Sequence, residues 1–381
     1  MKRNVYADNC ATTALDPAAF EAMTPFLLGN YANASQPYAL ARAPKKALAD
    51  ARETIADAIG AAPDEIYFTS GGTESDNWAI KGVVGRQAGE GSRRRGVLAS
   101  AIEHHAVLRA VESVRRLGAP VAYLAPDRRG VVRSEELARL ISDEVALVSV
   151  MLVNNELGAI QPIAALAELA RSRGALFHTD AVQGVGHVPI DVKALGVDLL
   201  SASAHKFNGP KGVGFLYVRR GVELAPFLDG GGQERGLRAG TENVAGVVGM
   251  ATALQANVAA LASTQAALAG VETRFLSTLN ALGVVYALNS GEATRAPGVL
   301  SLAFPGFEGE ALLHRLDLLG VSVSTGSACN SQETEISHVL KAIGAPDSLA
   351  RGTIRISFGK QNTEEDALYV AECLAKITRT R

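Results

Sequence analysis

The segment from Glu65 to Arg219 alternates short apolar runs with amphipathic stretches, and this alternation constrains the fold more than any other feature of the chain. The strand-like runs are residues 66–68, 97–99, 145–153 and 175–178, and the helix-like stretches are residues 73–84, 106–117 and 163–173. Strands that alternate with helices of about ten to fifteen residues indicate βαβ units. We therefore predict an α/β fold with a mostly parallel sheet and helices on both faces.

The pattern changes after Asn243. Residues 244–282 are rich in Ala and Leu, which indicates one long helix or two joined ones, and the shorter runs beyond them are typical of a smaller α+β unit. A chain of 381 residues suits two domains. We predict a large domain over residues 13–250, and a small domain that combines residues 1–12 with residues 251–381.

Charge and composition argue against several classes of function. The formal net charge is −2, with 37 basic and 39 acidic residues, so the chain lacks the basic footprint of a nucleic-acid-binding protein. No window approaches about eighteen consecutive apolar residues, and the first residues lack the apolar core of a secretory signal. Three cysteines fit a reducing compartment. We expect a cytoplasmic protein that contacts neither membrane nor nucleic acid directly.

A lysine and an aspartate that follow apolar runs are the strongest sign of chemistry. Lys206 ends the tetrad Ser203-Ala204-His205-Lys206, directly after an apolar run at residues 197–200. Partial desolvation there would keep its amine nucleophilic. Asp180 follows another apolar run, and a lysine with a carboxylate at a strand end is what pyridoxal phosphate requires: the amine binds the aldehyde, and the carboxylate keeps the ring nitrogen protonated. Taken alone, such a lysine is more often a solvated surface residue.

Three further polar groups follow predicted strands. Gly72 and Thr73 lie between a strand and a helix, where backbone N–H groups and a hydroxyl can bind an anion, or where Thr73 simply caps a helix after a tight turn. His104 follows the next strand and can stack on a planar ring or serve as a structural hydrogen-bonding residue. Asn155 offers an amide, or belongs to a polar turn. Ligands collect at such strand ends.

Two more residues have functional interpretations. Cys329 lies in a stretch of small and polar residues without periodicity, typical of a flexible loop, which favours a reactive thiol over a structural one. Arg355 shares one strand face with Thr353 and Ser357 and suits the capture of a carboxylate, although a surface arginine is the simpler alternative. Cys373 fits the core face of a C-terminal helix, and Cys10 is ambiguous.

Eight blocks in family order make the chain resemble the pyridoxal-phosphate-dependent cysteine desulfurases of the NifS/IscS type, within the class V aminotransferase superfamily. The blocks are YADNCATT from Tyr6, FTSGGTESDN from Phe68, EHHAV from Glu103, NNELG from Asn154, HTDAVQ from His178, residues 203–212, GGGQERGLRAGTEN from Gly230 and GSAC from Gly326. The resemblance implies the fold type I of pyridoxal-phosphate-dependent transferases, in which a mostly parallel seven-stranded sheet flanked by helices forms the large domain and a smaller α+β domain accompanies it.

The resemblance also implies a cofactor site. Lys206 would bind the aldehyde of pyridoxal 5'-phosphate, Asp180 would pair with the ring nitrogen, and His104 would stack on the ring as a catalytic residue. Gln183 would hydrogen-bond the phenolic oxygen. The residues that would hold the phosphate are Gly72, Thr73, Ser203 and His205, with Thr241 reaching it from the second subunit of a homodimer.

The implied reaction converts L-cysteine to L-alanine. Asn33, Asn155 and Arg355 would bind ring or substrate, and Asn155 also counts among the cofactor contacts. Lys206 would remove the α-proton, and Cys329, on a mobile loop at about residues 325–336, would take the sulfur as a persulfide. A sulfur-acceptor protein, either an iron–sulfur scaffold or an enzyme of tRNA, DNA or cofactor thiolation, would then receive it.

The sequence departs from the family pattern in three places, and two alternatives stay open. Cys10 stands where alanine is usual, Tyr38 where histidine is usual and Ile336 where proline is common. Selenocysteine lyase, or another β-eliminating or transaminating enzyme, would share the fold. A catalytically silent sulfur-relay scaffold would have lost the lysine or the loop cysteine, and both Lys206 and Cys329 are present.

Overall fold

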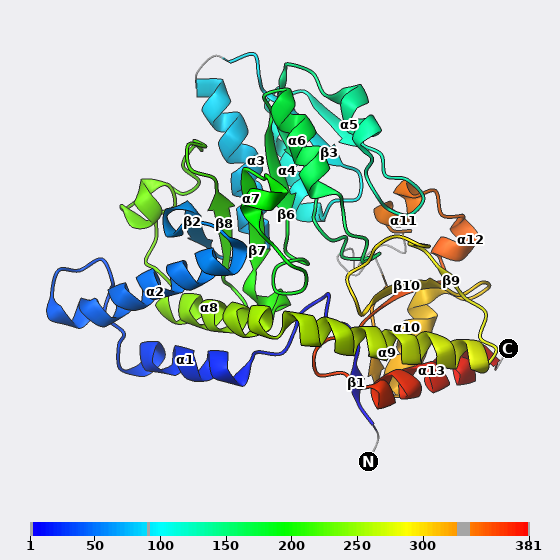
Figure 1. The fold of residues 1–381 in the computed structure, drawn as a ribbon. Helices are drawn as coiled ribbons and strands as arrows, with labels where there is room; N and C mark the ends of the chain where they lie inside the picture. Colours follow the sequence, from blue (N-terminus) through cyan, green and yellow to red (C-terminus); the bar gives the residue numbers. More distant parts are fainter. Residues whose placement is uncertain (1–2, 90–91, 326–335, 380–381) are drawn as a thin grey trace.

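A seven-stranded sheet forms the centre of the larger part of the molecule (Figure 1). The computed structural model describes residues 3–89, 92–325 and 336–379. The strands run in the order β2-β8-β7-β6-β5-β3-β4, and β8 is antiparallel to both of its neighbours while the other neighbouring pairs are parallel. The strands are β2 (Ile66–Thr69), β3 (Gly96–Ser100), β4 (Val121–Leu124), β5 (Val145–Ser149), β6 (Leu176–Asp180), β7 (Leu199–Ser203) and β8 (Gly214–Val218). The predicted α/β fold with a mostly parallel seven-stranded sheet is confirmed.

Helices cover both faces of this sheet because successive strand residues point to opposite sides. On β7, Leu199 packs under α3 (Gly72–Gly89) and α4 (His105–Arg116), in a core that includes Trp78 and Val107. Leu200 points to the other face, where a second core includes Phe177. The helices on that side of the large part are α2 (Arg42–Ile59), α5 (Ser134–Leu140), α6 (Ile163–Ser172), α7 (Val192–Leu195) and α8 (Val244–Ala259).

Two joined helices connect the large part to the smaller one. Of the two forms predicted for residues 244–282, the structure has the joined pair: α8 ends at Ala259 and α9 (Leu261–Ala281) follows after a bend of 70°. α8 packs against α1 (Pro17–Leu28) and α2, whereas α9 packs against α13 (Glu364–Arg379). No single helix among the described residues is long and apolar enough to cross a membrane.

The smaller part is built on two short sheets and its own apolar core. β12 (Thr353–Ser357), β10 (Val299–Ala303) and β9 (Ala287–Leu288) form an antiparallel sheet. β1 (Val5–Tyr6) pairs in parallel with β11 (Val321–Ser322), so the N-terminal segment lies on this part. Its helices are α10 (Gly309–Leu318), α11 (His338–Ala342), α12 (Asp347–Ala350) and α13. The domain boundary near residue 250 stays a prediction.

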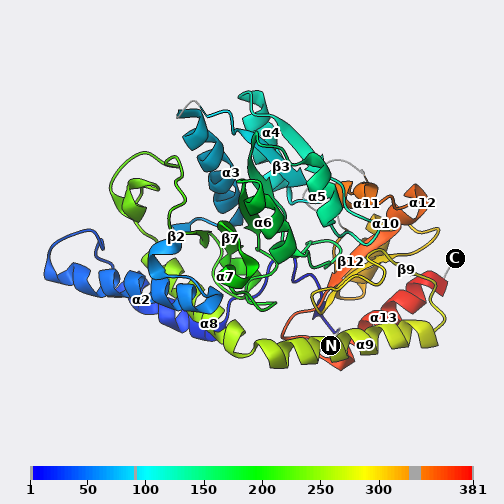
Figure 2. The same cartoon turned by 45° about the horizontal axis from the view of Figure 1, so that its top comes forward.

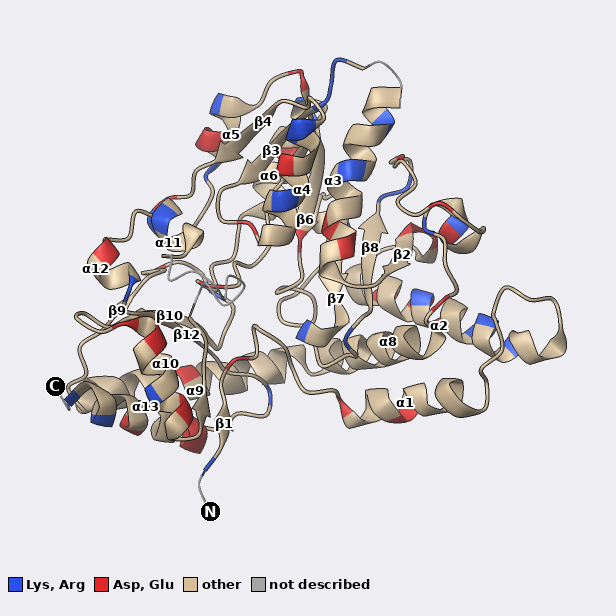
Figure 3. Cartoon of the chain, turned by 180° about the vertical axis from the view of Figure 1, so that it is seen from behind, with Lys and Arg blue, Asp and Glu red and all other residues tan. Residues whose placement is uncertain are grey.

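The two parts meet at the carboxyl edge of the large sheet. The residues that follow β3, β5, β6 and β7 lie at that edge because these strands are parallel. Figure 2 shows the small part beside the large one, while the segment between α1 and α2 projects at the opposite end. Seen from behind in Figure 3, basic and acidic positions are interspersed over both parts.

The remaining short elements are 3₁₀ segments, and the last of them contains two residues with positive φ, Glu234 and Arg235. They are η1 (Ala39–Ala41), η2 (Pro63–Glu65), η3 (Ala204–Lys206) and η4 (Gln233–Gly236). η3 directly follows β7, so the end of that strand turns sharply and presents Lys206 at the sheet edge.

Candidate active site

An open cavity at the start of α3 forms a cradle suited to an anion. It is lined by Thr12, Ser70, Gly71, Gly72, Thr73, Glu74, Ser203, His205, Lys211 and Gly212. The N–H groups of the first turn of a helix have no partner within the helix, and the helix dipole adds partial positive charge there. Hydroxyl groups of Thr73 and Ser203 and the ammonium group of Lys211 complete a donor set for phosphate. Four predicted phosphate ligands, Gly72, Thr73, Ser203 and His205, therefore lie together.

The glycines of the cradle are required by close approach. A Cβ on Gly72 would lie 2.5 Å from Cγ2 of Val182, and Gly71 has φ of +148°, which L-residues rarely adopt. A side chain at Gly214 on β8 would meet the backbone of Gly71 at 2.7 Å. The cradle is therefore open because three glycines remove side chains around it.

His205 contributes a neutral imidazole to this cradle. Its Nδ1 lies 3.1 Å from the hydroxyl of Thr12. Burial lowers the pKa of His205 to about 4, and the charges of Lys206 and Lys211 act in the same direction. An anion here is therefore held by hydrogen bonds and by nearby ammonium groups rather than by a charged His205 ring.

Lys206 and Asp180 lie beside the cradle. The Nζ of Lys206 donates to the carbonyl oxygens of Cys10 at 2.6 Å and Ala11 at 2.8 Å. Asp180 is 3% exposed, and its Oδ1 accepts the N–H of Val182 at 2.9 Å. Burial raises the pKa of Asp180 to about 6, while that N–H and the ammonium of Lys206 favour the charged form. The Asp180 carboxylate can thus hold a proton on a neighbouring ring nitrogen.

His104 and Gln183 follow β3 and β6 at the carboxyl edge of the sheet. His104 caps α4, and its Nδ1 accepts the N–H of Ala106 at 3.1 Å, so the proton of the neutral ring is on Nε2. Burial, together with the charge of Lys206, lowers the pKa of His104 to about 4. Gln183 donates one amide hydrogen to the Cys10 carbonyl at 2.9 Å.

Arg355 supplies a cation from the small part. Its Nη2 forms an ion pair with Asp8 at 2.8 Å, its Nη1 donates to the backbone oxygen of Asn155 at 3.0 Å, and its Nε has no hydrogen-bond partner among the described residues. Arg355 is 5% exposed, so this free N–H is buried. A buried donor without a partner costs free energy, which an incoming carboxylate would recover.

Three predicted site residues lie away from this group or outside the described chain. Asn33 accepts the N–H of Ser35 within the projecting segment between α1 and α2. Thr241 is exposed, and it is next to Glu242, which accepts a hydrogen bond from Ser35 at 3.3 Å. Asn33 and Thr241 therefore share one end of the large part. Cys329 lies outside the described residues, and its role stays a prediction.

Sequence reasoning missed several residues of the site. Thr12 and Lys211 line the cradle, and Asp8 holds Arg355. Asp8 and Thr12 belong to the matched block at the N-terminus, and Lys211 lies in the block after Lys206, so their polar character inside those blocks was an available signal. The role of the Cys10 backbone carbonyl carries no side-chain signal at all.

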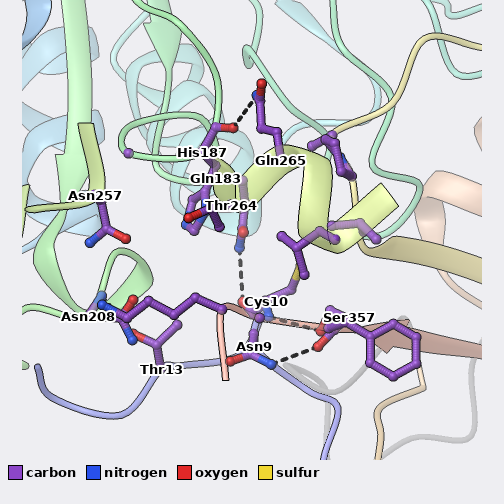
Figure 4. A pocket seen from close by; sticks show the side chains of 18 of the residues that line it. Asn9, Cys10, Thr13, Gln183, His187, Asn208, Asn257, Thr264, Gln265 and Ser357 are labelled. Carbon is purple, nitrogen blue, oxygen red and sulfur yellow. Dashed lines mark hydrogen bonds between the residues drawn. The ribbon is translucent and has the colours of Figure 1, made fainter. Parts of the chain in front are cut away.

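A second cavity lies between the two parts, shown in Figure 4. Gln183, His187 and Asn208 line it from the large part, Thr264 and Gln265 from α9, and Ser357 from the small part, with Asn9, Cys10, Thr13 and Asn257 among the other labelled residues. Gln183 and Cys10 border both this cavity and the lysine site. Most of the side chains that line this second cavity are amides or apolar groups.

The comparisons with known proteins agree with this geometry. The family described as aminotransferase class-V matches residues 5–370. The cysteine desulfurase IscS of Clostridium botulinum is 44% identical over 383 residues, covering 100% of this chain and 96% of the relative. A solved structure of a NifS-like protein has a TM-score of 0.93 at 38% identity and full coverage of both chains. A structure of SspA in complex with cysteine has a TM-score of 0.84 at 35% identity, covering 94% of this chain and 99% of its own.

Proposed function

The chain belongs to the aminotransferase class-V family and is a pyridoxal-phosphate-dependent cysteine desulfurase, and we propose the following roles for its residues in that reaction. The observation that carries these roles is the juxtaposition at the sheet edge. There the Lys206 amine and the buried Asp180 lie beside a glycine-lined anion cradle, with Arg355 held nearby through Asn155.

The residues present fit the cofactor. The N-terminus of α3 and the hydroxyls of Thr73 and Ser203 would bind the phosphate, Asp180 would pair with the ring nitrogen, and His104 would stack on the ring. Once bound, pyridoxal phosphate withdraws electrons from the α-carbon of an amino acid attached to it. Gln183 has a second amide hydrogen with which to bind the phenolic oxygen.

The substrate L-cysteine is oriented by its carboxylate. The unpartnered Nε and the fork of Arg355 receive that carboxylate, with the Asn155 amide beside it. Lys206 takes the α-proton at Nζ after it has lost its own proton. The sulfur of the substrate bonds to Sγ of Cys329, the carbon–sulfur bond breaks, and a proton replaces sulfur on the β-carbon. Lys206 returns a proton to the α-carbon, and the proton lost from the Cys329 thiol accounts for the one gained at the β-carbon. L-alanine leaves and Cys329 keeps one persulfide, so atoms and electrons balance.

We also propose a homodimer, because one end of the large part exposes apolar side chains and holds two predicted site residues that lie away from the cradle of their own chain. Leu27, Leu28, Tyr31 and Leu40 are between 57% and 78% exposed, and they lie on α1 and in the projecting segment. Asn33 and Thr241 lie at the same end, away from the cradle of their own chain. A second copy docked there would cover the apolar side chains and bring Thr241 to the phosphate of its neighbour.

The persulfide passes to an acceptor protein in this proposal. An iron–sulfur scaffold and a thiolating enzyme of tRNA or cofactors both fit, since either receives sulfur by thiol exchange. We propose a cytoplasmic location, where thiols stay reduced.

Incubation of the purified protein with L-cysteine and a reductant tests the activity. Alanine and sulfide are quantified for the wild type, Lys206→Ala and Cys329→Ala. We expect Lys206→Ala to form no alanine, and Cys329→Ala to bind the cofactor with its normal colour but to release almost no sulfide. Undiminished sulfide from Cys329→Ala would contradict the role of that cysteine. A parallel assay with selenocysteine distinguishes a selenocysteine lyase, which would turn over that substrate in preference.

A further inference from the structure

Three buried carboxyl groups lie together at the floor of the cofactor site, and the proposed function uses only Asp180. Asp76, on the inner face of α3, is 1% exposed, and Glu103, between β3 and α4, is 0% exposed. The three are close enough for their charges to interact, since Asp180 acts on both of the others and Glu103 acts on Asp76.

Asp76 faces a neutral histidine. Within the described part of the chain its Oδ1 has no hydrogen-bond partner, and Nε2 of His178 lies 3.7 Å from it. The His178 ring is held between the hydroxyls of Ser149 at 2.8 Å and Ser201 at 2.9 Å, on neighbouring strands. Burial lowers the pKa of His178 to about 3, so this ring supplies no positive charge.

Glu103 also has few interactions that would stabilise a negative charge on its carboxyl group. Its Oε1 accepts the N–H of Met151 at 2.7 Å, but its Oε2 has no hydrogen-bond partner in the residues that the structure describes. The neighbouring rings of His104, His105 and His338 all have lowered pKa values, because each is desolvated. In the described part of the chain, no group of three His, Cys, Asp or Glu side chains could hold a metal ion that would neutralise the acids.

The number of positive charges near the three carboxyl groups decides how many of them can ionise. Lys206 is the ammonium group that acts on Asp180, and the bound cofactor adds one proton at its ring nitrogen. A buried carboxylate without a cation is strongly disfavoured and takes up a proton instead. Three carboxylates here would outnumber these two positive charges.

We propose that Asp76 and Glu103 remain protonated and neutral, so that Asp180 alone carries the negative charge that pairs with the cofactor's ring nitrogen. This inference rests on the proposed function for the role of Asp180. Its physical consequence is that Asp180 stays ionised: a second carboxylate beside it would raise the pKa of Asp180 and favour a proton on Asp180 itself.

The directions of the pKa shifts agree with this assignment. Burial is the largest cause and the charge of Asp180 the second, and they raise the pKa of Glu103 to about 8. The same two causes raise the pKa of Asp76 well above its usual range, although a hydrogen bond with Ser201 opposes them. Glu103 therefore holds its proton at pH 7, and the pKa of Asp76 is shifted in the same direction.

Infrared spectra of the cofactor-free protein test the proposal directly. A protonated carboxyl group has a carbonyl stretch distinct from that of a carboxylate. We expect that stretch in the wild type at pH 7, reduced in Glu103→Gln and in Asp76→Asn, and reduced further in the double variant. The Glu103 contribution should also fade in the wild type as the pH rises through about 8. If the wild-type-minus-variant difference spectra show no loss of the protonated-carboxyl stretch, the proposal is overturned.

Cofactor binding supplies the second test. Glu103→Gln and Asp76→Asn should bind pyridoxal phosphate within a factor of about three of the wild type at pH 7, because each swap changes no charge. Asp180→Asn, which removes the charge, should bind with an altered visible spectrum. If Glu103→Gln folds but changes the spectrum as Asp180→Asn does, the inference is wrong. If the wild type itself binds no cofactor, the proposed function fails, while the infrared result still tests the protonation.

Discussion

Replacing Glu103 by glutamine should make the cofactor-free protein more resistant to rising pH. The pKa of Glu103 is raised in the folded protein from 4.5 to about 8, chiefly by burial. A raised folded-state pKa contributes stability that is fully present below pH 4.5 and is lost as the pH rises toward 8, because only the unfolded chain releases the proton. The amide in Glu103→Gln has no proton to lose in this range, so the variant should lack this decline.

The size of the effect follows from the shift. The difference between 8 and 4.5 is 3.5 pH units, and each unit corresponds to about 1.36 kcal/mol, which gives an upper limit of about 5 kcal/mol across that range. Between about pH 5.5 and pH 8 the expected change is about 3 kcal/mol. This is a large part of the stability of an ordinary domain, about 5–15 kcal/mol.

Urea unfolding at four pH values between about 5.5 and 8 measures this difference. The free energy of unfolding of Glu103→Gln minus that of the wild type should rise steadily with pH. Glu53→Gln, which changes an exposed carboxyl on α2, is the matched control and should run parallel to the wild type. Parallel curves for Glu103→Gln and the wild type would refute the reasoning, since they would mean that Glu103 titrates alike in the folded and unfolded chains.

Three further changes have definite expected outcomes. Gly72→Ala places a Cβ 2.5 Å from a Val182 methyl group, so it should cost about 1–3 kcal/mol and weaken cofactor binding in a fluorescence titration; unchanged binding would contradict the cradle. Arg355→Lys loses the planar fork, so KM for L-cysteine should rise about 10- to 100-fold, corresponding to about 1.5–3 kcal/mol, with a smaller change in kcat; an unchanged KM would remove Arg355 from the substrate site. Ser337→Ala removes the 2.6 Å hydrogen bond to the buried Glu156 and should cost about 1–3 kcal/mol in thermal unfolding, whereas an unaltered Tm would show that the bond contributes little.

Much of the fold was predictable because the pattern is local. The alternation of apolar runs and amphipathic stretches between Glu65 and Arg219 reports strand and helix periods directly, and the parallel sheet follows from their order. The bend after Ala259 was not predictable in the same way. Ala260 interrupts the helix with no Gly or Pro beside it, so the break depends on packing against two different parts of the molecule rather than on local preference.

In the candidate site, too, some residues were predictable from local sequence patterns and others were not. Lys206 and Asp180 were predictable because each follows an apolar run that ends at the sheet edge. The ion pair of Arg355 with Asp8 joins residues that are 347 positions apart, and periodicity carries no information on such a pair. Asp76 and Glu103 were missed as buried acids because burial without a cation is a property of the assembled site, and an acidic side chain on a helix is ordinarily solvated.

The covalent attachment point of the cofactor is the most direct test of the account. The protein is loaded with pyridoxal phosphate, reduced with borohydride to fix the linkage, digested and analysed by peptide mass spectrometry. The account predicts a phosphopyridoxyl group on the peptide that contains Lys206, and none on the same peptide of Lys206→Ala. A label on a different lysine, or a wild-type protein that retains no label, would contradict it.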